Sequence, residues 1–187
     1  MVQQSSKITV GQGQLLIASP FLNDRNFRKS VVLLAEHGPE GSLGFIINHK
    51  TSLTLGQVLE GVANDWPIFY GGPVGHDSLF YVHTLGTALQ GARHVVGNIW
   101  WGGSFDDLKR LLLENRVPPD ALKLFAGYSG WGKGQLLDEL EENAWIVHPA
   151  RGLNVLDDEP EELWRSLIQK TPGYALWYNM PEAPYLN

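Results

Sequence analysis

The sequence predicts an α+β domain with a mixed sheet. Two observations support this class. Strand-like segments with short turns fill the first part of the chain, and helical patterns separate the later strands. The composition gives the material for a packed core, because 43% of the 187 residues are hydrophobic and only 18% are charged. A chain of this length fits one domain, and such a domain buries roughly 70% of its unfolded surface.

The first half of the chain contains the patterns of several strands. Residues 1–13 are polar and rich in Gly and Gln, so we expect a loosely ordered arm before the first apolar run. Runs of β-branched and apolar residues then predict strands, and Gly38–Gly41 predicts a turn that joins two of them into an antiparallel hairpin. The predicted strands cover residues 15–18, 30–35, 43–48, 67–70 and 78–85.

Helix signals start in the middle of the chain. Thr54 and Gln57 have the spacing of a capping box, which predicts a short helix. Ser104 and Asp107 repeat that spacing, and an apolar face of Phe105, Leu108, Leu111 and Leu112 follows. Between these helices, Val95-Val96 and residues 99–101 indicate a further strand.

Strands and helices alternate in the last third. We predict strands over residues 122–126 and 145–147 and a helix over residues 135–143. A last helix is expected to start at Pro160, since proline suits the first helical position and the acidic run 157–162 suits the positive end of a helix. No repeat or linker divides the chain, so residues 1–187 are expected to form a single domain.

Charge and composition exclude several classes of function. The formal charge of −6 argues against direct nucleic-acid binding, whose affinity depends on clustered Lys and Arg. There is no cysteine, hence no disulfide and no thiolate metal site. No secretory signal and no run of the ~18 apolar residues of a membrane span are present, so we expect a cytoplasmic protein without membrane contact.

The Gly-rich stretch 127–134 nearly matches two catalytic motifs. Gly127, Gly132 and Lys133 fit a phosphate loop, and together with Gly130 they form a candidate anion-binding turn between a strand and a helix. However, Gly134 stands where the loop needs a hydroxyl for magnesium. Ser129 also sits where a nucleophile elbow would place it, but the elbow needs glycine at the position of Trp131. A simple turn that glycine permits is the third interpretation, and we favour it.

Polar residues beside the apolar strands offer one further candidate site. The six histidines show no metal-binding spacing, so no metal and no cofactor is expected. If a ligand pocket exists, we expect it where the loop 24–28 approaches polar strand residues, although His83 on an apolar strand is more often structural. The candidate ligand-binding residues are Asp24, Asn26, Arg28, His37, Asn48 and His83.

Taken together, these segments resemble the YqgE/AlgH family of bacterial proteins over nearly the whole chain. The resemblance rests on several short fragments in the same order: residues 15–20 with Asp24, Phe27 and 30–32; Glu36-His37 with Gly44 and Asn48; residues 71–74; Phe80 with His83; Gly127-Tyr128 with Trp131; and residues 134–136 with 143–145. It implies a sheet that curls into a pseudo-barrel with flanking helices, and it implies no established enzyme activity. Some members of the family are labelled transcriptional regulators, but this chain is acidic and has no helix-turn-helix pattern.

The leading functional hypothesis is therefore a non-enzymatic regulatory protein that binds a protein or a small molecule. The alternative is an enzyme with an unrecognised site, such as a hydrolase or a nucleotide-binding protein that uses the 127–134 turn. The segment Trp100-Trp101-Gly102-Gly103 is distinctive, and its residue types do not indicate a role.

Overall fold

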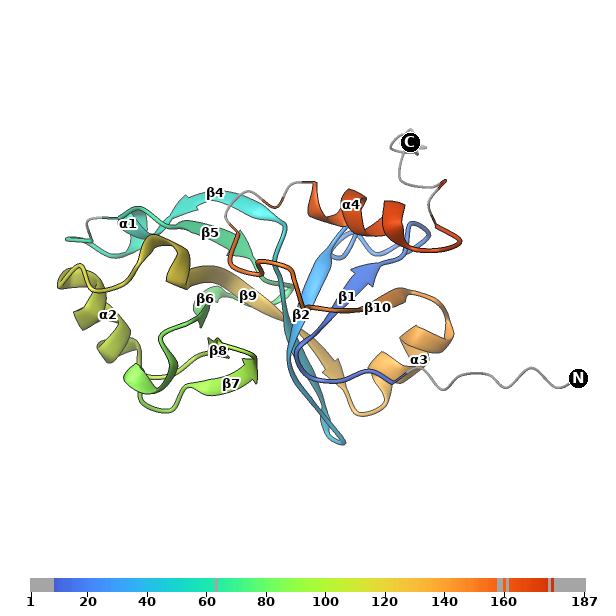
Figure 1. Cartoon of the computed structure of the whole chain (residues 1–187), viewed down its shortest axis with the longest axis horizontal. Coiled ribbons are helices and arrows are strands. Elements are labelled where there is room, and N and C mark those ends of the chain that lie inside the picture. The colour runs from blue at the N-terminus through green and yellow to red at the C-terminus, as the bar shows by residue number, and fades with distance from the viewer. Residues whose placement is uncertain (1–8, 63, 158–159, 161, 175, 177–187) are drawn as a thin grey trace, which may run out of the picture.

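Strand β9, Leu122–Gly132, runs through the middle of the molecule and connects its two halves (Figure 1). The computed structural model describes residues 9–62, 64–157, 160, 162–174 and 176. The other strands within this part of the chain are β1 Gln14–Ala18, β2 Val31–Gly38, β3 Gly41–Ile46, β4 Lys50–Thr54, β5 Pro67–Tyr70, β6 Val74–His83, β7 Arg93–Val96, β8 Ile99–Trp101 and β10 Trp145–Pro149. The helices are α1 Leu55–Val58, α2 Phe105–Leu113, α3 Gln135–Glu141 and α4 Leu163–Lys170.

The described strands form one open, curled sheet, in the order β10-β1-β2-β3-β9-β6-β8-β7. Strand β5 pairs with β9 in parallel and with β4 in antiparallel fashion, whereas every other pairing is antiparallel. The predicted α+β class with a mixed, largely antiparallel sheet is therefore confirmed. The sheet does not close on itself, so the expected pseudo-barrel is a curl with two free ends.

Most of the predicted strands are present, including the hairpin of β2 and β3, which pairs Val32 with Ile46. Two predictions need correction. The single strand expected around residues 95–101 is a hairpin of β7 and β8, and the strand expected to end at residue 126 continues to Gly132. Strand β4 had no signal in the sequence, because its residues are mostly exposed and do not alternate.

The two longest helices in the described chain are amphipathic, as predicted. Ser104 caps α2, since its hydroxyl accepts a hydrogen bond from the Asp107 amide at 3.2 Å. Leu108 is buried, as predicted for the apolar face of this helix. Phe105, which was assigned to the same face, is 41% exposed and so is only partly buried. Helix α4 begins at Leu163 rather than at the predicted Pro160. Residues 158, 159 and 161 of the acidic run lie outside the described residues.

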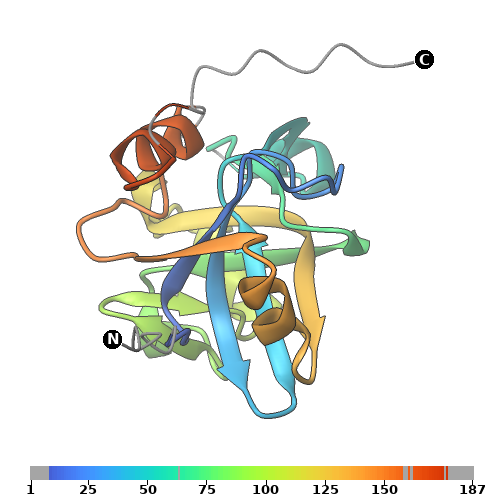
Figure 2. The same ribbon diagram turned by 90° about the vertical axis from the view of Figure 1, so that its right-hand side faces the viewer.

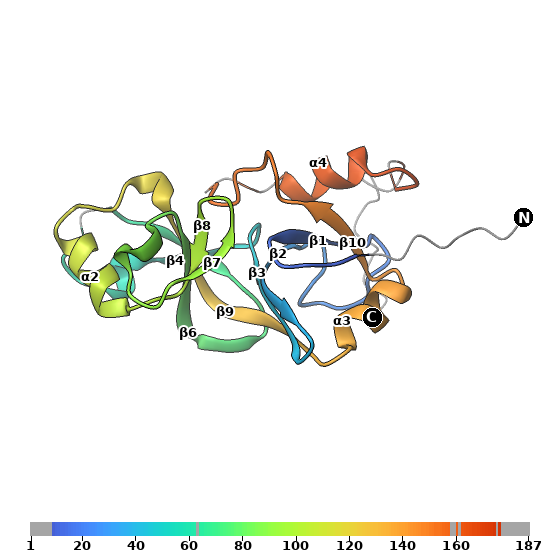
Figure 3. The same ribbon diagram turned by 60° about the horizontal axis from the view of Figure 1, so that its bottom comes forward.

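Helices cover both faces of the sheet near its β10 end. Helix α4 packs on one face, where Trp164, Leu167 and Ile168 join a core cluster with Leu15 and Leu33. Helix α3 packs on the opposite face, where Leu136 and Leu140 meet Leu16, Val32 and Ile46 (Figure 2). Figure 3 shows the three layers edge on, with α4 and α3 on either side of β1, β2 and β10. Period-two alternation in β1 and β2 supplies both faces.

The other half of the molecule has its own core. Leu55, Ile68, Tyr81, Leu108 and Leu124 form a cluster between α1, α2 and the sheet. Strand β9 belongs to both halves, because Phe125 packs in one cluster and Leu124 in the next. Strand β9 therefore contributes to the hydrophobic cores of both halves.

The predicted N-terminal arm lies partly outside the described residues, which start at residue 9. In the part that is described, Val10 is buried and the Gly13 amide donates to the Leu34 carbonyl at 2.8 Å. These contacts attach residues 10–13 to the sheet. Among the described helices, none combines the length and apolar character that a membrane crossing requires.

Candidate functional site

The predicted polar site is partly assembled around Asn48. Its side chain is 8% exposed; it accepts a hydrogen bond from the Val31 amide at 2.7 Å and donates to the Lys29 carbonyl at 2.9 Å. Asn48 therefore holds the end of the 24–29 loop against the start of β2. Both of these hydrogen bonds are with backbone groups, which is the pattern of a structural asparagine.

The loop residues of the predicted site lie at the surface. The carboxylate of Asp24 accepts from the Asn26 amide at 2.8 Å, and the Tyr70 hydroxyl donates to the Asn26 side chain at 3.4 Å. Burial, and then the charge of Asp24, raise the pKa of Tyr70. Arg28 is exposed. The loop thus approaches Asn48 and Tyr70, but it lines none of the cavities described below.

The two predicted histidines do not join this group. His37 lies near the tip of the β2–β3 hairpin, where its Nδ1 is 2.8 Å from the Ser42 hydroxyl. His83 lies on β6, which pairs with β8 and β9 instead. It is fully buried, with Nε2 3.0 Å from the Gly102 carbonyl and Nδ1 accepting from the Leu85 amide at 3.2 Å. Burial lowers its pKa, against the opposing effect of the Gly102 carbonyl, and both ring nitrogens lie within hydrogen-bonding distance of backbone groups.

The distinctive segment 100–103, which comprises the end of β8 and the two glycines after it, has a structural role near His83. Gly102 supplies the carbonyl for His83, and the Gly103 carbonyl accepts from the Tyr81 hydroxyl at 2.6 Å. Trp101 packs on Phe45 with ring centroids 5.7 Å apart, and Trp100 meets His94 edge to face. The segment therefore attaches the β7–β8 hairpin to the core.

The Gly-rich stretch is not a strand-to-helix turn. Gly127, Gly130 and Gly132 belong to β9, and only Lys133 and Gly134 form the turn before α3. Amides of a paired strand point alternately to its two neighbours, so they cannot surround one phosphate as a phosphate loop does. The expected turn is therefore limited to Lys133 and Gly134, and the other three residues of the candidate anion site lie in a strand.

Ser129 does not form a nucleophile elbow. Ser129 is fully buried inside β9, and its hydroxyl donates to the Gly71 carbonyl at 3.0 Å. An elbow would instead expose the serine at a sharp turn. Trp131 packs beside α3, where its indole and that of Trp145 both donate to the Glu139 carboxylate at 2.8 and 2.7 Å.

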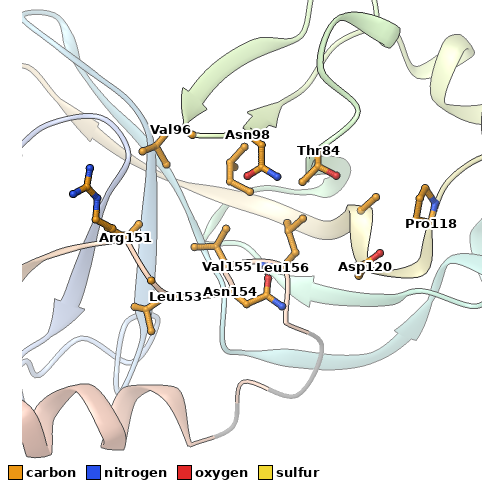
Figure 4. A pocket seen from close by; sticks show the side chains of 15 residues that line it. Thr84, Val96, Asn98, Pro118, Asp120, Arg151, Leu153, Asn154, Val155 and Leu156 are labelled. Carbon is orange, nitrogen blue, oxygen red and sulfur yellow. Dashed lines mark hydrogen bonds between the residues drawn. The ribbon is translucent and has the colours of Figure 1, made fainter.

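A cleft that the sequence did not indicate lies between the two halves of the molecule. It encloses about 560 Å³, which is within the usual range for small-molecule sites. Its walls come from the Gly97-Asn98 turn of the β7–β8 hairpin, from residues 118–121 and from the loop 150–156 that follows β10 (Figure 4). We call it the central cleft.

Apolar and polar groups have separate places in the central cleft. Val155 and Leu156 are almost fully buried and lie between its ends, while Asn98 comes from the β7–β8 turn and Thr84 from the residue after β6 (Figure 4). Arg151 lies at one end and Asp120 at the other. Within the part of the chain that the structure describes, no hydrogen bond or ion pair occupies the side chains of Thr84, Asn98, Asp120 and Arg151.

A buried lysine holds one wall of the central cleft. Lys123 on β9 is 1% exposed, and its ammonium donates to the Asp157 carbonyl just beyond Leu156. The same ammonium lies 3.6 Å from the centroid of the Phe69 ring, as a cation–π contact. Because a buried charge needs such partners, Lys123 anchors the end of the 150–157 loop.

The sequence contained only a weak signal for the central cleft. Residues 151–154, Arg-Gly-Leu-Asn, and the Gly97-Asn98 pair are typical turn residues, and turns often carry binding groups. Nothing in their spacing showed that the two turns meet. Among the described residues, no group of three or more His, Asp or Glu side chains is arranged to hold a metal ion.

The open curled sheet and the central cleft between its two halves characterise this α+β protein. Comparison with known proteins gives the family. The chain belongs to the AlgH-like family (DUF179), whose model matches residues 15–175. The resemblance found in the sequence is thereby confirmed.

Several relatives match over almost their full length. A UPF0301 protein of Cytophaga hutchinsonii is 38% identical over 179 residues, which cover 94% of this chain and 98% of the relative. The UPF0301 protein BF2109 of Bacteroides fragilis is 35% identical, covering 98% of this chain and 95% of the relative.

Solved structures share the fold. The solution structure of the AlgH protein from Pseudomonas aeruginosa superposes with a TM-score of 0.70 at 30% identity, covering 98% of this chain and all of that one. The crystal structure of protein DIP2367 from Corynebacterium diphtheriae has a TM-score of 0.77 at 20% identity, with 93% and 94% coverage. Both solved structures therefore share the overall fold of this chain.

Proposed function

We propose that this protein is a non-enzymatic, cytoplasmic binding protein whose central cleft takes a small molecule. The proposal rests on four polar residues that line the central cleft beside the apolar residues Val155 and Leu156. Within the described chain, the side chains of these four residues form no hydrogen bond or ion pair with other residues. They are Thr84, Asn98, Asp120 and Arg151. Binding sites typically combine an apolar lining with a few polar groups of this kind. These four side chains offer hydrogen bonds and charge, and they include neither a histidine nor an activated nucleophile.

The charges of the central cleft suggest the class of ligand. Asp120 favours a cationic group at one end, and Arg151 favours an anionic group at the other. Val155 and Leu156 between them favour an apolar middle part. A short apolar peptide with free termini has this order of groups, and so do other small zwitterions with an apolar centre.

Titration of the whole chain with tri-alanine, followed by NMR amide shifts, tests this proposal. We expect shifts at residues 96–99, 118–121 and 150–156, and much smaller shifts with the same peptide acetylated and amidated at its ends. Asn98→Ala and Asp120→Asn should each weaken binding about tenfold, which is about 1.4 kcal/mol. Asp138→Asn, an exposed change on α3, is the matched control.

Two results would contradict the proposal. One is the absence of shifts around the cleft at millimolar tri-alanine and at millimolar levels of other zwitterions with apolar centres. The other is binding that the blocked peptide or the Asn98 and Asp120 variants retain unchanged. A hydrolysed peptide in the NMR sample would overturn the non-enzymatic part.

A regulatory role, if the family label of some members applies, would act through such a ligand or through another protein. The acidic charge of −6 supports this route over direct DNA reading. A gel-shift experiment at low salt, with a basic DNA-binding domain as positive control, should show no retarded band.

A further inference from the structure

A second concave surface lies on the α1 side of the molecule and shares no residue with the central cleft. It crosses the face of the neighbouring strands β4, β5, β9 and β6, which contribute Leu53, Ile68, Ala126 and Leu79. Helix α1 and Phe105 form its sides. We call this surface, of about 330 Å³, the apolar groove.

The apolar groove continues the hydrophobic core of this half of the molecule out to the solvent-exposed surface. Leu55 and Ile68 belong to the core cluster between α1, α2 and the sheet and are buried. Leu53, Val58 and Phe105, at the same surface, remain 46%, 57% and 41% exposed. Single exposed apolar side chains are ordinary, but a contiguous set in a groove marks an interaction site.

The charged residue that lines the apolar groove is acidic, and so is the residue that binds the backbone of helix α1 beside it. Asp77 lines it directly, and Asp65 accepts a hydrogen bond from the Gly56 amide of α1 at 2.9 Å. The described lining residues include no Lys or Arg. A segment with Lys or Arg beside its apolar side chains would therefore be complementary in charge.

We propose that the apolar groove docks a short segment of a partner protein in which apolar side chains are flanked by basic residues. The apolar side chains would cover Val58, Phe105 and Leu53, and the basic residues would meet the carboxylates on the rim. This is the groove mode of peptide recognition, in which buried apolar anchors give affinity and the charged rim gives specificity. The proposal does not depend on the ligand of the central cleft.

The test is a selection from a random peptide library displayed on phage, with the full chain as bait. We expect enriched peptides to carry apolar residues flanked by Lys or Arg. The variants Val58→Ser and Phe105→Ser should weaken the best synthetic peptide at least about tenfold, or about 1.4 kcal/mol each. Val58 is 57% exposed and Phe105 is 41% exposed, so we expect both variants to fold, and their urea unfolding curves check this.

Two further measurements test the charge of the groove and the location of the bound peptide. Asp77→Lys should also weaken the peptide, whereas Leu137→Ser, which alters a comparably exposed leucine on α3, should leave its affinity unchanged. Amide shifts on peptide addition should concentrate at residues 53–59, 76–79 and 105.

Five outcomes would overturn the proposal. The library could yield no enriched peptide, or peptides without basic residues. Enriched peptides could bind the Val58 and Phe105 variants as tightly as the parent. A concentration-dependent dimer that Val58→Ser abolishes would assign the groove to a second copy of the chain. Binding to vesicles of anionic lipid that the same variant abolishes would assign it to a membrane surface.

Discussion

Glu139 ties two indole rings to helix α3. Its Oε2 accepts hydrogen bonds from Trp131 on β9 and Trp145 on β10, and its Oε1 accepts from Gln135 at 2.9 Å. Both indoles are buried, so the loss of the carboxylate would leave two donors without a partner. One side chain therefore connects helix α3 to the strand before it and the strand after it.

Replacing Glu139 should reveal that role as a loss of stability. We expect Glu139→Ala to lower the free energy of unfolding by about 2 to 4 kcal/mol, because hydrogen bonds to a charged group are worth about 1.5 to 3 kcal/mol. Glu139→Gln, which keeps one acceptor oxygen, should lose less. Urea denaturation followed by tryptophan fluorescence measures both. Asp138→Ala on the exposed side of α3 is the control, and an equal loss there would contradict the assignment.

His83 should make the stability depend on pH. Its pKa in the folded protein is lowered by burial, so below the unfolded value of about 6.5 the unfolded chain binds the proton more readily. The stabilisation is complete above that value and decreases as the pH falls towards the folded pKa. The pKa of His49 is lowered for the same reason. His83→Gln should therefore remove part of the slope between about pH 7 and 5, and an unchanged slope in urea titrations would exclude His83 as a source.

The sequence identified several important residues but not what they do. His83 was one of the predicted ligand residues, although an apolar strand favoured a structural histidine, and its hydrogen bonds confirm the structural role. Asn48 was found because it is polar among apolar neighbours, but that pattern does not show that its partners are backbone groups. Arg151 and Asn98 carried no pattern, since a cleft depends on which turns meet in space.

At the scale of elements, three glycines explain how β9 can be so long. The chain between β5 and β6 crosses β9 at Gly71-Gly72, and a Cβ atom at Gly71 would lie 2.2 Å from the Gly127 carbonyl oxygen. Gly127 itself has a φ of +73°, a conformation that glycine adopts without a steric cost. The Gly71 carbonyl then accepts hydrogen bonds from the Ile46 amide and the Ser129 hydroxyl, both at 3.0 Å.

The crossing predicts a large difference between two glycine substitutions. Gly71→Ala should cost about 3 kcal/mol or more, the upper range for overpacking, because backbone atoms of β9 cannot move aside easily. Gly38→Ala at the β2–β3 turn, where a Cβ would meet nothing within 4 Å, should change stability by less than about 0.5 kcal/mol. Thermal and urea unfolding of the two variants measure the difference. Similar losses in both would mean that the crossing is not tightly packed.

Elements with a strong local signal were predicted well, and those that depend on distant partners were not. The N-cap of α2 is a local interaction, so Ser104 marked the helix start correctly. Strand β9 beyond residue 126 is rich in glycine, a residue with low strand preference, and it is a strand because β3 and β6 pair with it. The same glycines had suggested a turn, and with it both catalytic motifs.

At the scale of the whole molecule, β9 and the loop 150–157 connect the two halves. Residues of β9 pack in both cores, while the loop leaves the β10 side and forms a wall of the central cleft. Lys123 on β9 fixes the far end of this loop through the Asp157 carbonyl. This buried contact and the packing of Val155 and Leu156 in the core hold the loop against the cleft.

Lys123→Met should release the loop without unfolding the protein. Methionine preserves most of the volume beside Phe69, and exchanging a buried charge for an apolar side chain is often nearly neutral in free energy. We expect the free energy of unfolding to change by less than about 2 kcal/mol, because only the charge and its local partners are lost. Amide hydrogen exchange at residues 150–157 should nevertheless become faster, since opening of this loop no longer breaks the lysine contact. Binding of tri-alanine should weaken as well, because Val155 and Leu156 would no longer be held in place.

Lys133→Met at the exposed turn before α3 is the matched control and should leave hydrogen exchange and tri-alanine binding unchanged. Unaltered protection of residues 150–157 in the Lys123 variant would show that the apolar packing of Val155 and Leu156 alone holds the wall of the cleft.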